Sequence, residues 1–265
     1  MTDMQRNAWI NTISTLVFSA FCALLRWLQN INVFEEETGL VKAGSALNYL
    51  VALVAIGAAV ALWVLCHPLE RYSAPTEPEE AFADAPRGLM AVLVAAALAA
   101  AVGSVFFFFT GSSLLLRVTA LLSLLSVPAL MLYPYLPRWG ALGAVLSLAP
   151  VLSFSVYLVA AYREYAGNPV VWSYAPLILA VAAVLYGAFQ MSAYLFYRPR
   201  PVMAIYSGCL APVFALGILM DTAAGAARLV LGAWSVGLLA LSGLLILNLS
   251  EKSAADDGDM DEDYE

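Results

Sequence analysis

Eight apolar stretches, each about 20 residues long, dominate this sequence. An α-helix needs about 20 apolar residues to cross the hydrocarbon core of a bilayer. A membrane β-barrel would instead show segments of about ten residues in which apolar and polar side chains alternate. The sequence therefore predicts an all-α fold, a polytopic transmembrane helical bundle of about eight spans.

The composition agrees with that prediction. Charged residues make up 12% of the chain and hydrophobic residues 63%, whereas about a quarter of the residues in a soluble domain are charged. We place the spans at residues 8–28, 44–65, 88–109, 114–133, 140–161, 171–195, 202–220 and 229–248.

Two similar segments favour an internal duplication. Residues 86–91 read PRGLMA and residues 199–204 read PRPVMA, and an apolar span and a further arginine follow each of them. We predict two four-helix halves, residues 1–137 and 138–250. Four spans per half would insert both halves the same way up, as in transporters built from parallel repeats.

Two segments outside the spans carry much of the net charge of −7. The loop at 66–87 is rich in proline and acidic residues, which predicts an extended, solvated linker. The tail at 251–265 is dense in aspartate and glutamate, which predicts disorder. Because the chain has no basic cluster, we expect no nucleic-acid partner. The partners we expect are the lipid bilayer and a protein that contacts the acidic loop and tail.

The distribution of basic residues favours cytoplasmic termini, because cytoplasmic loops carry the excess of Lys and Arg. With eight spans, both termini lie on one side of the membrane. The segments on that side hold seven of the basic residues, namely Arg6, Arg71, Arg87, Arg138, Arg198, Arg200 and Lys252. The other side holds Arg26, Lys42, Arg117, Arg163 and Arg228.

Polar side chains recur every three or four residues along the first span, so they share one face of the helix. Small polar residues commonly pack transmembrane helices together, and the alternative is a path for a substrate. The residues on this face are Asn11, Ser14, Thr15, Ser19, Cys22 and Arg26.

Three charges at span ends are the candidate site residues: Arg117, Asp221 and Arg228. Asp221 precedes Arg228 by one short turn and could pair with it. If the duplication is real, Arg117 and Arg228 are equivalent positions. We interpret the three charges as structural, through ion pairing or by reaching toward the membrane surface. The alternative is a gate for an anion or another substrate.

The sequence favours no enzymatic function. Its one histidine, His67, cannot supply the paired histidines of an intramembrane metalloprotease. A serine nucleophile needs a positioned base, and the pattern offers none. Three scattered cysteines fit buried structural thiols. We therefore expect no catalytic residue, no metal and no cofactor.

The segment 154–221 contains YREYAGNPVVWSY, AFQMSAYLF and YRPRPVMAIYSGCLAPVFALGILMD. It resembles an uncharacterised family of polytopic membrane proteins from anaerobic Gram-positive bacteria. The resemblance implies a protein of the bacterial cytoplasmic membrane, and it assigns no ligand or catalytic residue.

Two functions remain open. The first is a non-enzymatic scaffold or accessory subunit, favoured by two acidic segments expected on one face. The second is a small-molecule transporter, favoured by Pro128, Pro150 and Pro212 within spans, because prolines free backbone carbonyls that can line a site. Against transport, these prolines do not fall at corresponding places in the two halves.

Overall fold

The structure, a computed structural model, describes residues 3–35, 41–42, 45–73, 75, 77–83, 85–168, 170–221 and 225–251. Eight of its helices are long and apolar enough to cross a membrane. They are α1 (Asp3–Asn32), α2 (Ala46–Cys66), α4 (Arg87–Thr110), α5 (Leu114–Met131), α6 (Ala141–Tyr165), α7 (Val171–Leu195), α8 (Pro201–Gly217) and α9 (Ala227–Leu247). The predicted all-α polytopic bundle of eight spans is confirmed.

Short elements connect or extend these helices. Local sequence explains several boundaries: the Ser113 hydroxyl accepts a hydrogen bond from the Leu116 N–H at the start of α5, and Pro201 occupies the first position of α8, where its missing N–H costs nothing. The short elements are η1 (His67–Arg71), β1 (Tyr72–Ser73), α3 (Pro78–Ala81), η2 (Tyr133–Trp139), η3 (Ile218–Met220) and β2 (Ser250–Glu251).

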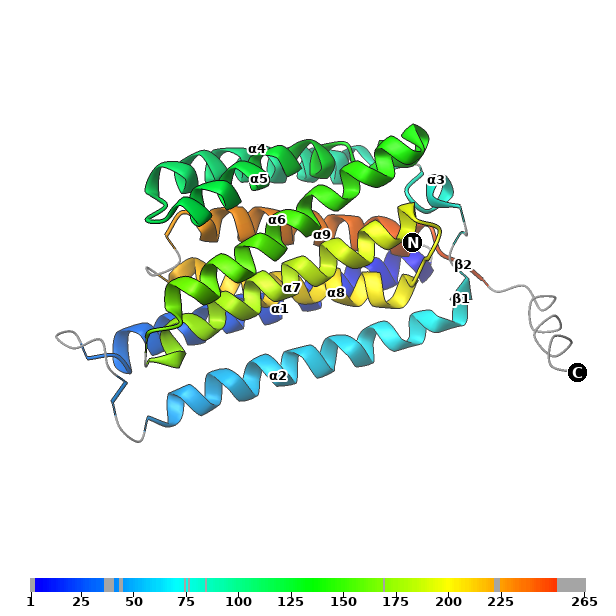
Figure 1. Ribbon diagram of the computed structural model, residues 1–265. Coiled ribbons are helices and arrows are strands. Elements are labelled where there is room, and N and C mark those ends of the chain that lie inside the picture. The colour runs from blue at the N-terminus through cyan, green and yellow to red at the C-terminus, as the bar shows by residue number, and fades with distance from the viewer. Residues whose placement is uncertain are drawn as a thin grey trace, which may run out of the picture.

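Helices α8 and α9 form the centre of the bundle. Helix α9 packs against α4 and α8 and also meets α1 and α7, and it crosses the middle of the molecule in Figure 1. Most of its side chains are buried, including Trp234, whose ring meets the Phe154 ring edge-on at 5.6 Å. Apolar composition alone does not set this position, because α2 is as apolar as α9 and is mostly exposed at the side of the bundle.

Close approach of α8 and α9 depends on Gly208. A Cβ atom at that position would lie 2.9 Å from the Leu238 carbonyl oxygen and in collision with the Ser242 hydroxyl. Small residues let helix backbones approach closely in membranes, where dispersion contacts replace the hydrophobic effect as the main attraction between helices. The middle of the bundle is therefore filled by packed side chains and backbone.

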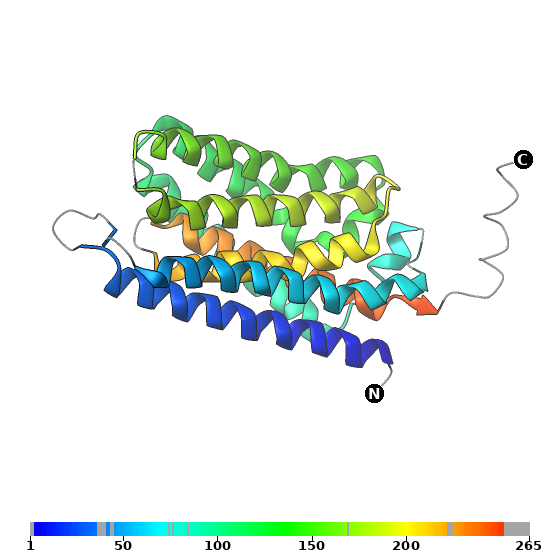
Figure 2. The ribbon, with the colours of Figure 1, turned by 90° about the horizontal axis from the view of Figure 1, so that it is seen from below.

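Two helical hairpins flank this centre. The α1–α2 hairpin packs on α8 and, through α1, on α9; the α4–α5 hairpin packs on α9 and α6. Figure 2 shows α1 and α2 running side by side along one flank. The described parts of the two hairpins make little direct contact with each other. The arrangement does not confirm the duplication, so the division into residues 1–137 and 138–250 stays a prediction.

The described residues of the loop at 66–87 do not form the extended, solvated linker that the sequence predicted. They fold back over one end of the bundle as η1, β1 and α3, and Phe82 and Ala81 are buried. The Phe82 ring lies edge-on to Tyr133 at 5.2 Å and to Tyr194 at 5.6 Å. Burial of one aromatic side chain between two others outweighs the loop's polar composition. We call this end of the bundle the capped end.

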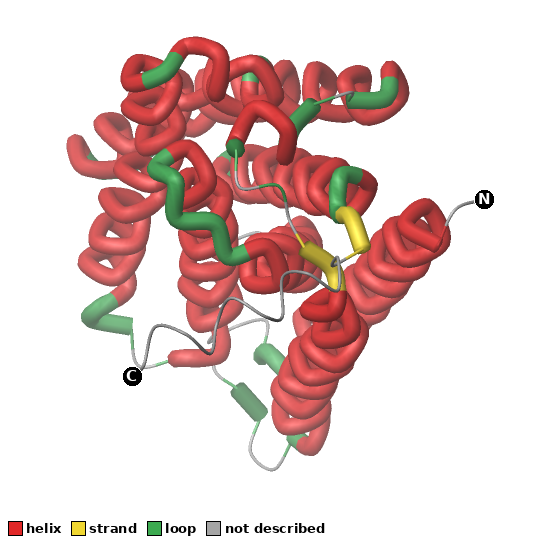
Figure 3. Tube along the Cα trace, turned by 90° about the vertical axis from the view of Figure 1, so that its right-hand side faces the viewer, coloured by secondary structure: helices red, strands yellow, loops and turns green. Residues whose placement is uncertain are grey.

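The end of α9 holds the capping loop in place. The Asn248 side-chain amide donates hydrogen bonds to the Ala81 carbonyl at 2.9 Å and the Ala83 carbonyl at 3.0 Å. Strands β1 and β2 pair antiparallel, with Tyr72 opposite Glu251. Figure 3 views this end and shows the strand pair lying across the helix ends. The start of the predicted tail is thus a strand beside the loop, and residues 252–265 lie outside the described residues.

Candidate functional site

A buried polar cluster lies at the end of the bundle opposite the capped end. The polar face predicted for the first span leads into it, since Asn11, Thr15 and Ser19 are buried along α1 toward Arg26. The Ser19 hydroxyl donates a hydrogen bond to the Thr15 carbonyl one turn earlier, at 2.7 Å. The face therefore points into the bundle, as its helical spacing predicted.

Arg26 and Asp221 form the centre of the cluster. The Arg26 Nε–H donates to Asp221 Oδ1 at 2.7 Å, and an Nη2–H donates to Oδ2 at 3.1 Å. Their side chains are only 5% and 4% exposed. Two parallel hydrogen bonds between guanidinium and carboxylate are the strongest geometry for such a pair.

Three amide side chains complete the cluster. Arg26 also donates to the Gln29 Oε1, and the Gln29 amide donates to the Asn48 Oδ1 on α2. Asn30 donates to Asp221 Oδ1 at 2.8 Å and to the Met220 carbonyl at 3.1 Å. The buried charges are thus hydrogen-bonded on several sides, which a charge removed from water requires. The cluster joins α1, α2 and the segment after α8.

The sequence predicted that the Asp221 carboxylate pairs with Arg228, and this prediction is wrong. Arg228 lies next to Asp221, but its Nη1–H groups donate to the backbone carbonyls of Leu219 and Asp221, each at 3.1 Å. The Asp221 carboxylate pairs with Arg26 instead. Arg228 satisfies carbonyls at the end of η3 that have no helical partner, a common role for arginine there.

Arg117 has a similar role at another turn. Its Nε–H donates to the Gly111 carbonyl, 3.2 Å away, at the end of α4. The structure therefore brings Asp221 and Arg228 together and places Arg117 in a separate turn. Both arginines bind carbonyls that follow a transmembrane helix, which fits a structural function.

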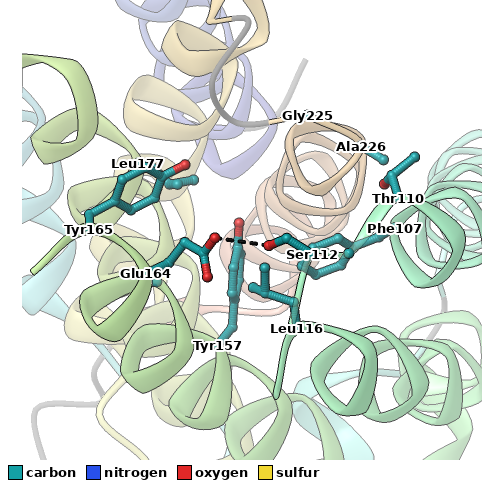
Figure 4. Close-up of a pocket in the computed structure, with 12 residues that line it drawn as sticks. Phe107, Thr110, Ser112, Leu116, Tyr157, Glu164, Tyr165, Leu177, Gly225 and Ala226 are labelled. Atoms are coloured by element: carbon teal, nitrogen blue, oxygen red, sulfur yellow. Dashed lines mark hydrogen bonds between the residues drawn. The ribbon is translucent and has the colours of Figure 1, made fainter. Parts of the chain in front are cut away.

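A small cavity of about 230 Å³ lies between the α4–α5 turn, α6, α7 and the start of α9. Figure 4 shows its lining, with the Ser112 hydroxyl directed at Glu164. The Ser112 Oγ–H donates to Glu164 Oε1 at 2.8 Å. Phe107 and Tyr157 pack together beneath them, with ring centroids 5.3 Å apart. The described lining contains one carboxylate, Glu164, and several hydroxyl groups, and it contains no histidine, cysteine or lysine.

Sequence reasoning missed Arg26, Gln29, Asn30 and Asn48 as members of the cluster. A usable signal existed, because an ionisable residue within a span requires an opposite charge, and Asp221 is an acid placed directly against a span end. Within the described residues, no group of three or more His, Cys, Asp or Glu side chains could hold a metal ion.

Comparisons with protein-family models, with curated proteins and with solved structures find no match for this chain. The resemblance to an uncharacterised bacterial membrane family therefore stays a prediction. The structure by itself identifies a polytopic membrane protein whose transmembrane helices are held together by a buried ion-pair cluster at one end and a docked acidic loop at the other.

Proposed function

We propose that the protein is a non-enzymatic scaffold or accessory subunit of the bacterial cytoplasmic membrane, and that its capped end binds a basic partner protein. The observation that carries the proposal is that the acidic loop has one side buried in the bundle and one side exposed. Phe82 and Ala81 hold one side of it in the bundle, while Glu77, Glu79 and Glu80 are exposed on the other.

An ordered acidic surface is a better docking site than a flexible linker. Docking fixes the three carboxylates relative to the membrane before a partner arrives, so less conformational entropy is lost on binding. Carboxylates clustered on one surface also attract basic partners and speed their association. Pairing of β1 with β2 brings the start of the acidic tail to the same place.

The packed centre supports this function over transport. A transporter needs a site between helices near the middle of the membrane, and here the α8–α9 contact occupies that position, with Gly208 against Leu238 and Ser242. Pro212 lies buried within α8. The Ser207 hydroxyl donates a hydrogen bond to the Ala204 carbonyl of the same helix. Transport would require this interface to separate.

The test is purification from native membranes in a gentle detergent, followed by mass spectrometry of co-purifying proteins. We expect a stoichiometric partner with the wild-type chain and its loss with the triple variant Glu77→Gln/Glu79→Gln/Glu80→Gln. Electrostatic attachment at an exposed surface should also weaken as salt increases.

Two controls separate charge from general damage. The variant Glu77→Asp/Glu79→Asp/Glu80→Asp keeps the charges and should keep the partner, and Glu164→Gln removes an acid at the opposite end of the bundle. A wild-type preparation without a stoichiometric partner would contradict the proposal. It would favour transport, to be tested by a thermal-shift screen of small metabolites.

A further inference from the structure

A lateral groove opens where the two hairpins flank α9 without meeting. Its walls come from the first half of α1 and the start of α4, and its floor is the second half of α9. The groove has a volume of about 580 Å³. We call it the α1/α4 groove. It faces outward from a transmembrane bundle, so in a bilayer either lipid or another protein must fill it.

The lining of the groove is chemically suited to a hydrocarbon chain. Trp9, Leu16 and Val92 form apolar walls, and Ala240 and Gly243 form part of the floor. A Cβ atom added at Gly243 would meet nothing within 4 Å, and the same is true at Gly88 on the α4 wall. The floor and the α4 wall therefore leave open space at these two positions.

The length of the groove matches one leaflet of the bilayer. On α1 its lining extends from Gln5 to Leu16, which at 1.5 Å per residue is about 17 Å. Half of a hydrocarbon core of about 30 Å is about 15 Å. A partner helix that crosses the membrane would need a contact surface over both leaflets, whereas an acyl chain needs only one.

Positive charge lies at the open end of the groove. Arg6 follows Gln5, and Arg87 lies between the lining residues Pro86 and Gly88; both arginines are exposed. This is the capped end of the bundle, where the membrane surface meets the helix ends. Guanidinium groups bind phosphate oxygens through paired hydrogen bonds.

We propose that the α1/α4 groove binds one acyl chain of an anionic phospholipid from the leaflet at the capped end. The chain lies along Leu16, Val92 and Ala240, and the headgroup phosphate lies within reach of Arg6 and Arg87. The phospholipid closes the gap between the hairpins. This site does not use Glu77, Glu79 or Glu80, the carboxylates of the proposed docking surface.

The experiment uses the full chain reconstituted in bilayers of equal amounts of phosphatidylglycerol and phosphatidylethanolamine. Native mass spectrometry then counts the phospholipids that stay bound and identifies them. We expect one retained phospholipid, predominantly phosphatidylglycerol. In Gly88→Leu/Gly243→Leu the new side chains enter the open space, and the retained fraction should fall several-fold.

Matched variants distinguish the groove from general lipid adhesion. Gly57→Leu places the same side chain at an exposed position on α2 that also has no atom within 4 Å, and it should keep the phospholipid. Arg6→Gln/Arg87→Gln should keep a phospholipid but lose the preference for phosphatidylglycerol. Arg198→Gln/Arg200→Gln removes the same charge from the same end, away from the groove, and should keep that preference.

Two results would overturn the proposal. Equal lipid retention by Gly88→Leu/Gly243→Leu and the wild type would show that the bound phospholipid lies elsewhere. A wild-type dimer without retained phospholipid, converted to a monomer by Gly88→Leu/Gly243→Leu, would show that a second copy of the chain fills the groove.

Discussion

At the scale of single residues, the ion pair of Arg26 with Asp221 is the main polar contact at the end of the bundle opposite the capped end. Both charges are almost fully buried, and the carboxylate holds the segment after α8 to α1. A buried pair can be replaced by apolar residues at little cost, but removal of one partner leaves an unpaired charge. Substitution of one partner should therefore destabilise the protein much more than replacement of both partners by apolar residues.

We predict that Asp221→Asn lowers the stability by about 3–5 kcal/mol, the usual cost of breaking a buried ion pair. The measurement is thermal or denaturant unfolding of the purified protein in detergent. The double variant Arg26→Met/Asp221→Leu should recover much of the loss, because it removes both charges. An Asp221→Asn protein as stable as the wild type would show that the pair does not hold these segments together.

This pair also shows a limit of inference from one sequence. Helical spacing placed Arg26 on the buried face of α1, and the end of the span placed Asp221 beside Arg228. Either Arg26 or Arg228 could supply the opposite charge that Asp221 requires, and the sequence pattern does not decide between them. That choice depends on α1 packing against α8, a contact between residues 195 positions apart.

At the scale of elements, apolar length predicted all eight transmembrane helices because the bilayer allows few other structures. The loop at 66–87 was predicted wrongly because its average composition concealed two large apolar side chains that are buried, Leu69 and Phe82. Phe82 stands among prolines, acids and small residues, yet it is buried between Tyr133 and Tyr194. The average composition of a loop does not reveal the individual apolar side chains that are buried.

We predict that Phe82→Ala releases the loop. Truncation of a buried phenylalanine typically costs about 3–5 kcal/mol, and two hydrogen bonds from Asn248 alone should not offset that loss. Limited proteolysis of the protein in detergent should then cut within residues 66–86 much faster than in the wild type. Glu80→Gln, on the exposed side of α3, is the control and should leave the cleavage rate unchanged.

The contact between α8 and α9 makes a further prediction. Gly208→Ala should destabilise the protein by about 1–3 kcal/mol, the usual range for overpacking, because the new Cβ collides with Ser242 and crowds the Leu238 carbonyl. Unfolding in detergent measures the loss. Gly57→Ala, which meets no atom within 4 Å, should be neutral or stabilising, since alanine favours a helix over glycine by about 0.5–1 kcal/mol. Equal stability of the two variants would contradict close packing at Gly208.

At the scale of the whole molecule, eight spans place both ends of the described chain on one side, and Figure 1 shows the start of α1 and strand β2 at the same end of the bundle. That end holds α3 with the exposed Glu77, Glu79 and Glu80, and the opposite end holds the cluster of Arg26 and Asp221. The orientation of the bundle in the membrane therefore decides which compartment meets the acidic surface.

We predict that the capped end faces the cytoplasm, because six of the basic residues that the structure describes lie on that side and five on the other. Green fluorescent protein fused to the C-terminus should fluoresce, and alkaline phosphatase at the same position should be inactive, since each reporter works on one side of the membrane only. Fusions within the α6–α7 loop, near Asn168, should give the reverse result. An active C-terminal phosphatase would place the acidic surface outside the cell. A cytoplasmic partner could then not reach Glu77, Glu79 and Glu80, and the scaffold function would require an extracytoplasmic partner.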